Sequence, residues 1–184
     1  SEEDVSESLA SIIEASPGRV LVTTFSSNVG RIRSIALAAE KVGRRVMILG
    51  RSMLRVCEVS RELGYLDGIA PFLSEDEFQS VPRRELVVIC TGSQGETRAA
   101  LGKMSREEHR NASLAPGDKV IFSSRSIPGN EREIINIQNA LIDLGVDVVV
   151  DGEQLVHVSG HPRRNELKKM YEWTRPTIGV PVHG

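Results

Sequence analysis

Short runs of apolar residues, many of them β-branched, recur along the chain between more polar stretches. Such runs are typical of strands that are buried on both faces of a parallel sheet. Four of the runs are strong, and they cover residues 19–25, 45–50, 85–92 and 119–124. Three weaker runs predict further strands over residues 146–151, 154–160 and 177–183.

The stretches between these runs carry apolar residues at helical spacing. They predict helices over residues 5–13, 32–43, 52–63, 134–144 and 163–173, and a loop that opens a helix over 93–104. Alternating strands and helices of this kind predict an α/β fold, in which helices flank both faces of a mostly parallel, Rossmann-like sheet. No repeat, low-complexity tract or linker interrupts the pattern, so we expect residues 1–184 to form one domain.

Composition is that of an ordinary globular protein, with 40% hydrophobic and 26% charged residues. The net charge of -2 gives no overall basic field, so a nucleic-acid partner would need a local cluster of Arg and Lys. Cys57 and Cys90 lie far apart without CxxC spacing, which predicts two buried thiols in a cytoplasmic protein. No run is long enough for a membrane span. The chain lacks an initiator Met and stops just after His183, so we expect it to be a piece of a longer protein.

The loops that follow the predicted strands are unusually alike. Each places small hydroxyl or glycine residues just before a helix, in the sequences TTFSSN, CTGSQGE, FSSRSIPGNE and HVSGHPRR. Backbone N–H groups at such positions can bind phosphate, although for any one loop ordinary helix capping is the more common explanation. Together the loops favour a polyanionic ligand at the carboxyl edge of the sheet. Neither GxGxxG nor GxxxxGK[ST] is present, so the usual nucleotide-binding signatures are missing.

Two of the four histidines fall where a predicted strand ends, and these are His161 and His183. Imidazole at such an edge can ligate a metal or transfer a proton near neutral pH. His109 is expected to be solvated at a charged helix end, and His157 to be a hydrogen-bonded structural residue within a strand. A catalytic zinc needs about three protein ligands, and no HxH or HExxH cluster exists here. Any metal site would therefore take most of its ligands from elsewhere.

Five segments in the same order resemble a known family. They are VTTFSSNVGRI, CTGSQGE, FSSRSIPGNE, HVSGHPRRNELKKMYEWTRP and GVPVHG. Together they closely resemble the β-CASP domain of bacterial ribonuclease J, a ribonuclease of the metallo-β-lactamase superfamily, over residues 1–184. The resemblance implies a domain inserted into a metallo-β-lactamase core of the same parent chain. It also implies two zinc ions held mainly by that core.

The resemblance further implies an activity for the parent protein. Members degrade RNA from a 5′-monophosphate end and also cut internally, in RNA decay and in RNA processing, including that of rRNA. The parent is expected to be a cytoplasmic homo-oligomer without a membrane segment. The fragment alone is expected to be inactive, because the zinc-binding core would be missing.

Site residues follow from the same resemblance. His161 matches a histidine at the reaction centre that stabilises or protonates the leaving oxygen. His183 matches a histidine that completes the metal site, and its presence favours RNA over DNA. The region that receives the 5′-phosphate of RNA matches Ser159, Gly160 and His161, together with Ser123, Ser124 and Arg125.

The predicted helix over residues 163–173 carries basic residues that could line an RNA channel through phosphate contacts, or could be an ordinary solvated face. These residues are Arg163, Arg164 and Lys168. Tyr171 and Trp173 on the same helix are expected to pack.

Two other functions fit the residues. One is a stand-alone α/β module that binds a phosphosugar or a nucleotide, which the Ser- and Gly-containing loops favour. The other is a domain that mainly supports oligomers or RNA-degrading assemblies.

Overall fold

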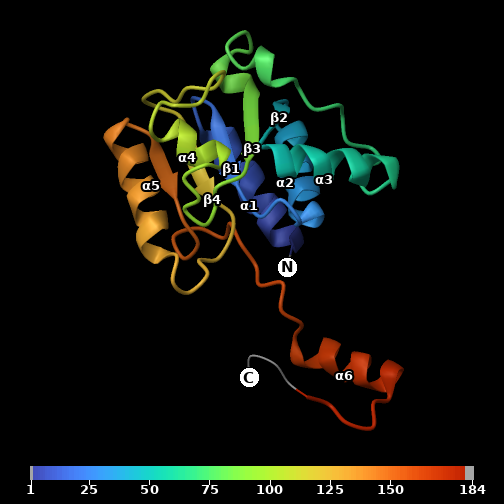
Figure 1. Cartoon of the computed structure of the whole chain (residues 1–184). Coiled ribbons are helices and arrows are strands. Elements are labelled where there is room, and N and C mark those ends of the chain that lie inside the picture. The colour runs from blue at the N-terminus through green and yellow to red at the C-terminus, as the bar shows by residue number, and fades with distance from the viewer. Residues whose placement is uncertain (1, 181–184) are drawn as a thin grey trace.

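A computed structural model describes residues 2–180. Its centre is a sheet of five parallel strands in the order β2-β3-β1-β4-β5 (Figure 1). The strands are β1 (Val20–Thr23), β2 (Arg45–Leu49), β3 (Leu86–Cys90), β4 (Lys119–Phe122) and β5 (Asp147–Val149). The four strong apolar runs of the sequence thus form the four longest strands, as predicted.

Helices cover both faces of this sheet. They are α1 (Glu2–Ala15), α2 (Val29–Lys41), α3 (Arg51–Glu62), α4 (Ala100–Met104) and α5 (Glu131–Asp143), and short 3-10 turns lie at Glu75–Glu77 and Arg83–Glu85. A sixth helix, α6 (Arg164–Thr174), does not cover the sheet. The first three helices pack their apolar residues on one face, and α4 and α5 pack on the other, which gives two separate apolar clusters. The predicted α/β class with helices on both faces is confirmed. None of the helices within residues 2–180 has the length and apolar character that a membrane crossing requires.

The register of the central strand brings the loops together at one edge. β1 pairs with β3 on one side and with β4 on the other, and Thr23 lies level with both Cys90 and Phe122. All four residues of β1 are buried. Because the strands are parallel and end at the same level, the segments after β1, β3 and β4 must meet at the carboxyl edge.

The opposite, amino edge is closed by buried ion pairs. Asp118, which is fully buried, accepts hydrogen bonds from the Arg19 backbone N–H at 3.1 Å and from Arg83 Nη2 at 2.7 Å. The Arg19 guanidinium lies 3.6 Å from the same carboxylate. A charge of this kind is stable when buried only if it is fully paired. The Asp118 carboxylate is therefore paired inside the amino edge, although the buried Arg19 Nε atom has no hydrogen-bond partner within residues 2–180.

The two last predicted strands are not found. Beyond β5 the chain forms only an isolated bridge between Asp151 and Gln154, and residues 155–160 form no strand. Val156 alone is buried there, and its carbonyl oxygen accepts side-chain hydrogen bonds in place of a strand ladder. The alternation of apolar residues that predicted a strand here comes from one buried residue, Val156, which anchors the segment to the rest of the protein. Residues 177–180 also form no strand, and the rest of that prediction lies outside the described residues.

Helix α6 is predicted correctly, but it lies apart from the globular part of the chain (Figure 1). It buries none of its residues. The prediction that Tyr171 and Trp173 pack is wrong in this structure, since their exposed fractions are 47% and 78%. The helix thus leaves an amphipathic face largely exposed, with the Tyr171 ring close to Gly179.

Gly95 allows the loop after β3 to touch α5. Its φ angle is +83°, and an added Cβ would lie 2.5 Å from the Glu133 Cβ. We predict that Gly95→Ala lowers the free energy of unfolding by roughly 2–4 kcal/mol, from left-handed strain plus overpacking. Chemical denaturation of the chain measures this loss. Gly43→Ala is the matched control, because Gly43 has a φ of +74° but no atom within 4 Å of an added Cβ. Equal losses in the two variants would contradict the packing role of Gly95.

Candidate functional site

The carboxyl edge of the sheet holds a hollow of about 610 Å³, named here the His161 pocket. The segment after β4 forms one wall and the segment after β5 forms another. The first residues of α1 and α2 also line it. Its lining comprises Glu2, Phe25, Asn28, Arg31, Arg125, Ser126, Ile127, Pro128, His157, Val158, Ser159, Gly160, His161 and Pro162.

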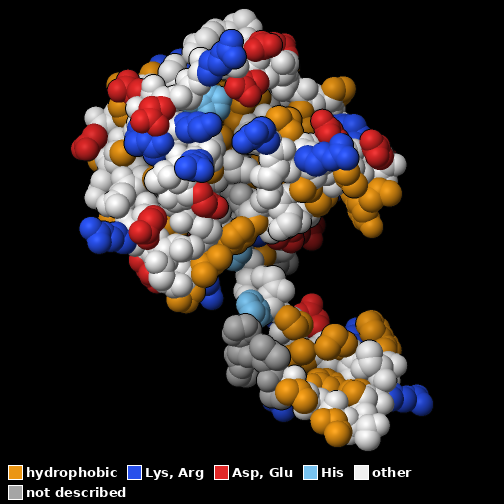
Figure 2. All heavy atoms as spheres, viewed as in Figure 1, with side chains coloured by type: hydrophobic (Ala, Val, Ile, Leu, Met, Phe, Trp, Pro, Cys, Tyr) orange, Lys and Arg blue, Asp and Glu red, His pale blue; other side chains and the backbone are white. Residues whose placement is uncertain are grey.

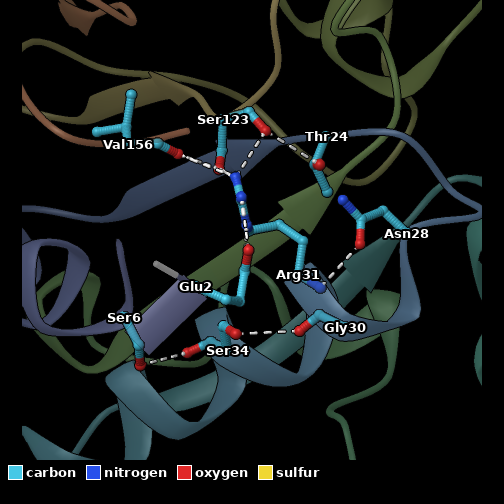
Figure 3. A network of polar contacts seen from close by, with 9 residues as sticks. All are labelled: Glu2, Ser6, Thr24, Asn28, Gly30, Arg31, Ser34, Ser123 and Val156. Atoms are coloured by element: carbon cyan, nitrogen blue, oxygen red, sulfur yellow. Dashed lines mark hydrogen bonds and ion pairs between the residues drawn. The ribbon is translucent and has the colours of Figure 1, made fainter. Parts of the chain in front are cut away.

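A buried arginine, Arg31, joins the elements that form this pocket (Figure 3). Its side chain is 1% exposed. On one side Nε and Nη2 donate to the two carboxylate oxygens of Glu2 at 2.6 and 2.9 Å. On the other side Nη1 donates to the Ser123 hydroxyl at 2.7 Å and to the Val156 carbonyl oxygen at 3.0 Å. One guanidinium thus connects α1, α2, the end of β4 and the segment after β5.

Local sequence explains why Arg31 is placed there. The Asn28 side chain accepts a hydrogen bond from the Arg31 backbone N–H at 3.0 Å and so caps α2. Arg31 then occupies the face of α2 that also carries Ile32 and Ile35, which are fully buried. A charged residue on such a face must find partners inside the protein. Glu2 supplies the opposite charge, and the Arg31 hydrogen bond holds the pKa of that carboxyl below its ordinary value.

Four of the six residues predicted to receive a 5′-phosphate line the His161 pocket together. They are Ser159, Gly160, His161 and Arg125. The Ser159 hydroxyl accepts a hydrogen bond from the His161 backbone N–H at 3.2 Å, which forms a tight local turn. Since all four residues are exposed, their polar groups are open to a ligand.

The other two predicted residues lie deeper. Ser123 is 1% exposed, and its hydroxyl donates to the Val156 carbonyl oxygen at 2.6 Å. Ser124 is also buried and contacts Gln94, and it lines a separate hollow of about 190 Å³. The structure therefore does not bring these two side chains into the His161 pocket, and their contact with phosphate stays a prediction.

His157 differs from the expected hydrogen-bonded residue. Its Nδ1 atom is buried and has no hydrogen-bond partner within residues 2–180. Burial, followed by the nearby Arg31 charge, lowers the pKa of this imidazole. The side chain lines the His161 pocket, so a neutral imidazole stands beside the exposed polar groups.

His109 is not the solvated residue that the sequence suggested. Its side chain is 11% exposed, and Nδ1 accepts a hydrogen bond from the Ala112 backbone N–H at 3.2 Å. Burial lowers the pKa of this imidazole as well. The predicted burial of Cys57 and Cys90 is confirmed.

The basic residues of α6 do not join the His161 pocket. Arg164 and Lys168 lie on the exposed helix, beside Leu167 and Tyr171. Arg163 precedes the helix, and its backbone N–H donates to Glu166 at 2.6 Å. An RNA channel along this helix stays a prediction.

A complete metal site is not formed by the residues that the structure describes. Within residues 2–180 there is no group of three His, Cys, Asp or Glu side chains that could hold a metal ion. His183, the predicted metal ligand, lies outside the described residues. The donors present here do not fit a zinc centre by themselves, since such a centre needs about three protein ligands.

Sequence reasoning missed Gln94 as well as Arg31. The Gln94 side chain donates to the Arg125 carbonyl oxygen at 3.1 Å and accepts from the Ile127 backbone N–H at 2.8 Å. It therefore fixes the loop that carries Arg125. A signal for Arg31 was present, because it is charged on an otherwise apolar helix face. No comparable signal marks Gln94, because its partners are backbone atoms of a distant loop.

Comparisons with known proteins agree with this arrangement. Residues 17–141 match the family model of the ribonuclease J β-CASP domain, and residues 145–184 match a Zn-dependent metallo-hydrolase RNA specificity domain. Ribonuclease J of Sinorhizobium meliloti is 60% identical over 184 residues, which cover 100% of this chain and 33% of that protein. Ribonuclease J of Mycolicibacterium smegmatis is 43% identical over 185 residues, again covering 100% of this chain and 33% of that protein.

A third relative, ribonuclease J of Thermus thermophilus, is 40% identical over 184 residues, which cover 100% of this chain and 32% of that protein. The chain thus spans about a third of the length of these relatives. Two family models share the chain, and they meet near the end of α5. A single domain over residues 1–184 stays a prediction.

We predict that Arg31→Lys lowers the free energy of unfolding by roughly 2–4 kcal/mol, because lysine cannot reproduce the planar set of donors and leaves buried partners unpaired. Hydrogen exchange of residues 156–161 should become faster in this variant. Arg33→Lys is the control, since Arg33 lies on the same helix but donates to backbone oxygens at an exposed position. Unchanged exchange at residues 156–161 would contradict the anchoring role of Arg31.

The Glu2–Arg31 pair predicts a pH dependence. Since the folded protein lowers the pKa of Glu2, the pair stabilises the fold above the ordinary pKa of a glutamate, and this contribution is lost as the pH falls through the folded pKa. Glu2→Gln should cost roughly 1–2 kcal/mol at neutral pH, a moderate value because Glu2 is partly exposed. The difference from the wild type should shrink toward pH ~3. Denaturation at several pH values, with Glu3→Gln as control, measures it, and a pH-independent difference would refute the assignment.

Proposed function

The chain belongs to the ribonuclease J family, and we propose that it is the RNA-binding part that completes the active site of a ribonuclease. The observation that carries this proposal is the His161 pocket. It gathers Arg125, Ser159, Gly160 and His161 on one open surface at the carboxyl edge of the sheet. The matched RNA specificity domain supports RNA as the ligand.

The His161 pocket would receive the 5′-monophosphate of RNA. Arg125 supplies a fixed positive charge, and the turn at Ser159 and Gly160 supplies a hydroxyl and backbone N–H groups. Guanidinium and backbone N–H groups are strong partners for phosphate oxygens. The buried Arg31 lies below and holds the segment after β5 in place.

His161 would act on the leaving oxygen. Its side chain is exposed at the pocket, on a turn that its own backbone N–H helps to fix. From that position an imidazole can donate a hydrogen bond or a proton to the oxygen that departs when a phosphodiester bond breaks. In this proposal His161 contacts the reacting atoms, and Arg125 orients the RNA strand by binding its 5′-phosphate.

Two zinc ions are part of the proposed parent enzyme, but residues 2–180 cannot hold them alone. Their ligands would come from a metallo-β-lactamase core of the same parent chain and from His183. The matched Zn-dependent metallo-hydrolase family supports this only in general terms.

Helix α6 would contact the missing core. Its Leu167, Met170, Tyr171 and Trp173 side chains are exposed, and an amphipathic helix gains stability by burying such a face. In this position Arg163, Arg164 and Lys168 could border an RNA channel between the two parts.

We further propose that the parent protein is a cytoplasmic homo-oligomer with exonuclease and endonuclease activity in RNA decay and rRNA processing. The 184-residue chain alone would be inactive.

The test uses the full-length protein and RNA with either a 5′-monophosphate or a 5′-hydroxyl end. We predict that Arg125→Gln reduces the preference for the 5′-monophosphate by about 10- to 100-fold, the value of one charged hydrogen bond. His161→Ala should lower kcat by roughly 10²–10⁴-fold with a smaller effect on KM. Steady-state kinetics on both RNAs measure these changes.

Arg132→Gln is the matched control, because Arg132 is exposed on α5 and lines none of the pockets described above. Wild-type end preference in the Arg125 variant would refute the phosphate site. A His161 variant with unchanged kcat would refute its catalytic role. Saturable binding of a phosphosugar or nucleotide, together with no cleavage of RNA by the full-length protein, would favour the alternative binding module.

A further inference from the structure

A second hollow, named here the basic pocket, lies at the same carboxyl edge and has a volume of about 660 Å³. The ends of β1 and β3, the start of α3 and the segment around α4 form its walls. Four cationic side chains line it, and they are Arg51, Arg98, Lys103 and Arg110. Figure 2 shows Lys and Arg side chains gathered on the face of the molecule that carries α4.

In the described part of the chain none of the four cations forms a direct ion pair, although the charge of Lys103, in addition to the Arg106 hydrogen bond, helps to lower the pKa of the nearby Glu108. Within residues 2–180 no ion pair or side-chain hydrogen bond involves any of the four. Among the acids that line the pocket, Glu108 pairs with Arg106 at 2.7 Å, outside the lining. Glu75 accepts from the Asn111 side chain at 2.9 Å.

The third acid, Glu96, accepts a hydrogen bond from the Gln94 backbone N–H at 2.8 Å. The only histidine in the lining, His109, is largely buried and uses Nδ1 as an acceptor. The lining thus carries four cations against three carboxylates, one of which is paired with Arg106 outside the lining, so its net charge is positive, which favours an anionic ligand.

The rest of the lining is suited to phosphate and ribose rather than to stacked bases. Hydroxyl groups come from three different segments, and they belong to Thr24, Ser26, Ser52, Thr91 and Ser93. The Thr24 hydroxyl already donates to the Ser123 carbonyl oxygen at 3.2 Å, so it is not available as a donor to a ligand. Phe25 is the only aromatic side chain apart from His109 in the described lining. Arginine and hydroxyl donors are the usual partners of sugar–phosphate backbones. A ligand with several phosphate groups fits better than a small neutral molecule.

The basic pocket is continuous with the proposed phosphate site. Phe25 lines both the basic pocket and the His161 pocket. Ser93 lines the basic pocket and also the small hollow that contains Arg125 and Ser126. An elongated polyanion that occupies the His161 pocket can therefore extend over Phe25 toward the four cations.

We propose that the basic pocket is a second RNA subsite, which binds backbone phosphates of a strand whose end occupies the His161 pocket. The position of the strand end rests on the proposed function, but the affinity of the basic pocket for phosphate does not. Arg98 and Lys103 contact phosphates from the α4 side, and Arg51 contacts them from α3. The contribution of these phosphate contacts to RNA affinity is independent of base sequence.

The test measures RNA binding by the full-length protein with the double substitution Arg98→Gln and Lys103→Gln. A phosphorothioate RNA of about ten nucleotides, within the usual range of single-strand site sizes, serves as the long probe. A 5′-phosphorylated dinucleotide serves as the short probe. The long probe should bind roughly 5- to 20-fold more weakly, and the slope of log affinity against log salt should fall by about 1.4, since two phosphate contacts are lost.

Binding of the dinucleotide should stay unchanged, because it reaches only the His161 pocket. The matched control is Arg84→Gln with Arg132→Gln, two exposed arginines outside the basic pocket with the same total change in charge. An equal loss in this control would reduce the effect to general electrostatics and overturn the proposal. An equal loss for both probes would overturn it as well.

Two further results would give the cations another role and so overturn the RNA subsite. One is a lower Tm with unchanged RNA binding, which would mean that the cations contact the rest of the protein. The other is saturable AMP binding that only the double variant loses, with unchanged binding of the long probe. Failure of the proposed function is distinguishable, because the wild type would then show no preference for a 5′-monophosphate while the basic pocket still bound the long probe.

Discussion

The carboxyl edge of this fold depends on one buried cation, Arg31. A guanidinium that is 1% exposed is tolerable only when its donors are all paired, because an unpaired buried charge costs several kcal/mol. Its partners come from three separate segments, and two of them, Glu2 and Val156, lie outside the sheet. The requirement to pair this charge therefore fixes the segment after β5, which has no strand ladder of its own. The exposed turn at Ser159 and His161 follows directly from that anchor.

Charged side chains are paired differently at the two edges of the sheet. At the amino edge Arg19 and Arg83 share the fully buried Asp118, so the negative charge of Asp118 is paired within the protein. At the carboxyl edge several cations form no direct ion pair within residues 2–180, although the charge of Lys103 acts on the nearby Glu108; they are Arg51, Arg98, Lys103, Arg110 and Arg125. An exposed guanidinium costs little in water and can still attract an anion. Ion pairs thus stabilise the fold at the amino edge, whereas the carboxyl edge keeps exposed cations that can bind an anion.

The sequence predicts the sheet well and the site only in part, for a physical reason. Continuous apolar runs such as the one at Val87 and Val88 need burial on both faces, so they report strands reliably. The run around Val156 misleads, because one buried residue between polar neighbours imitates strand alternation. His161 is recognisable because its motif is local in sequence. The contacts of Gln94 are not recognisable, since they join loops more than thirty residues apart.

The same distinction explains why the basic pocket has no sequence signature. Its cations come from the start of α3, from the segment before α4, from α4 itself and from the segment after it, and the parallel strand order brings these together. β3 lies between β2 and β1, so the loop with Arg98 is placed beside the helix with Arg51. In the sequence each of these cations looks like an ordinary solvated surface residue. They form a cluster because of the sheet topology, since parallel strands direct every following loop to one edge.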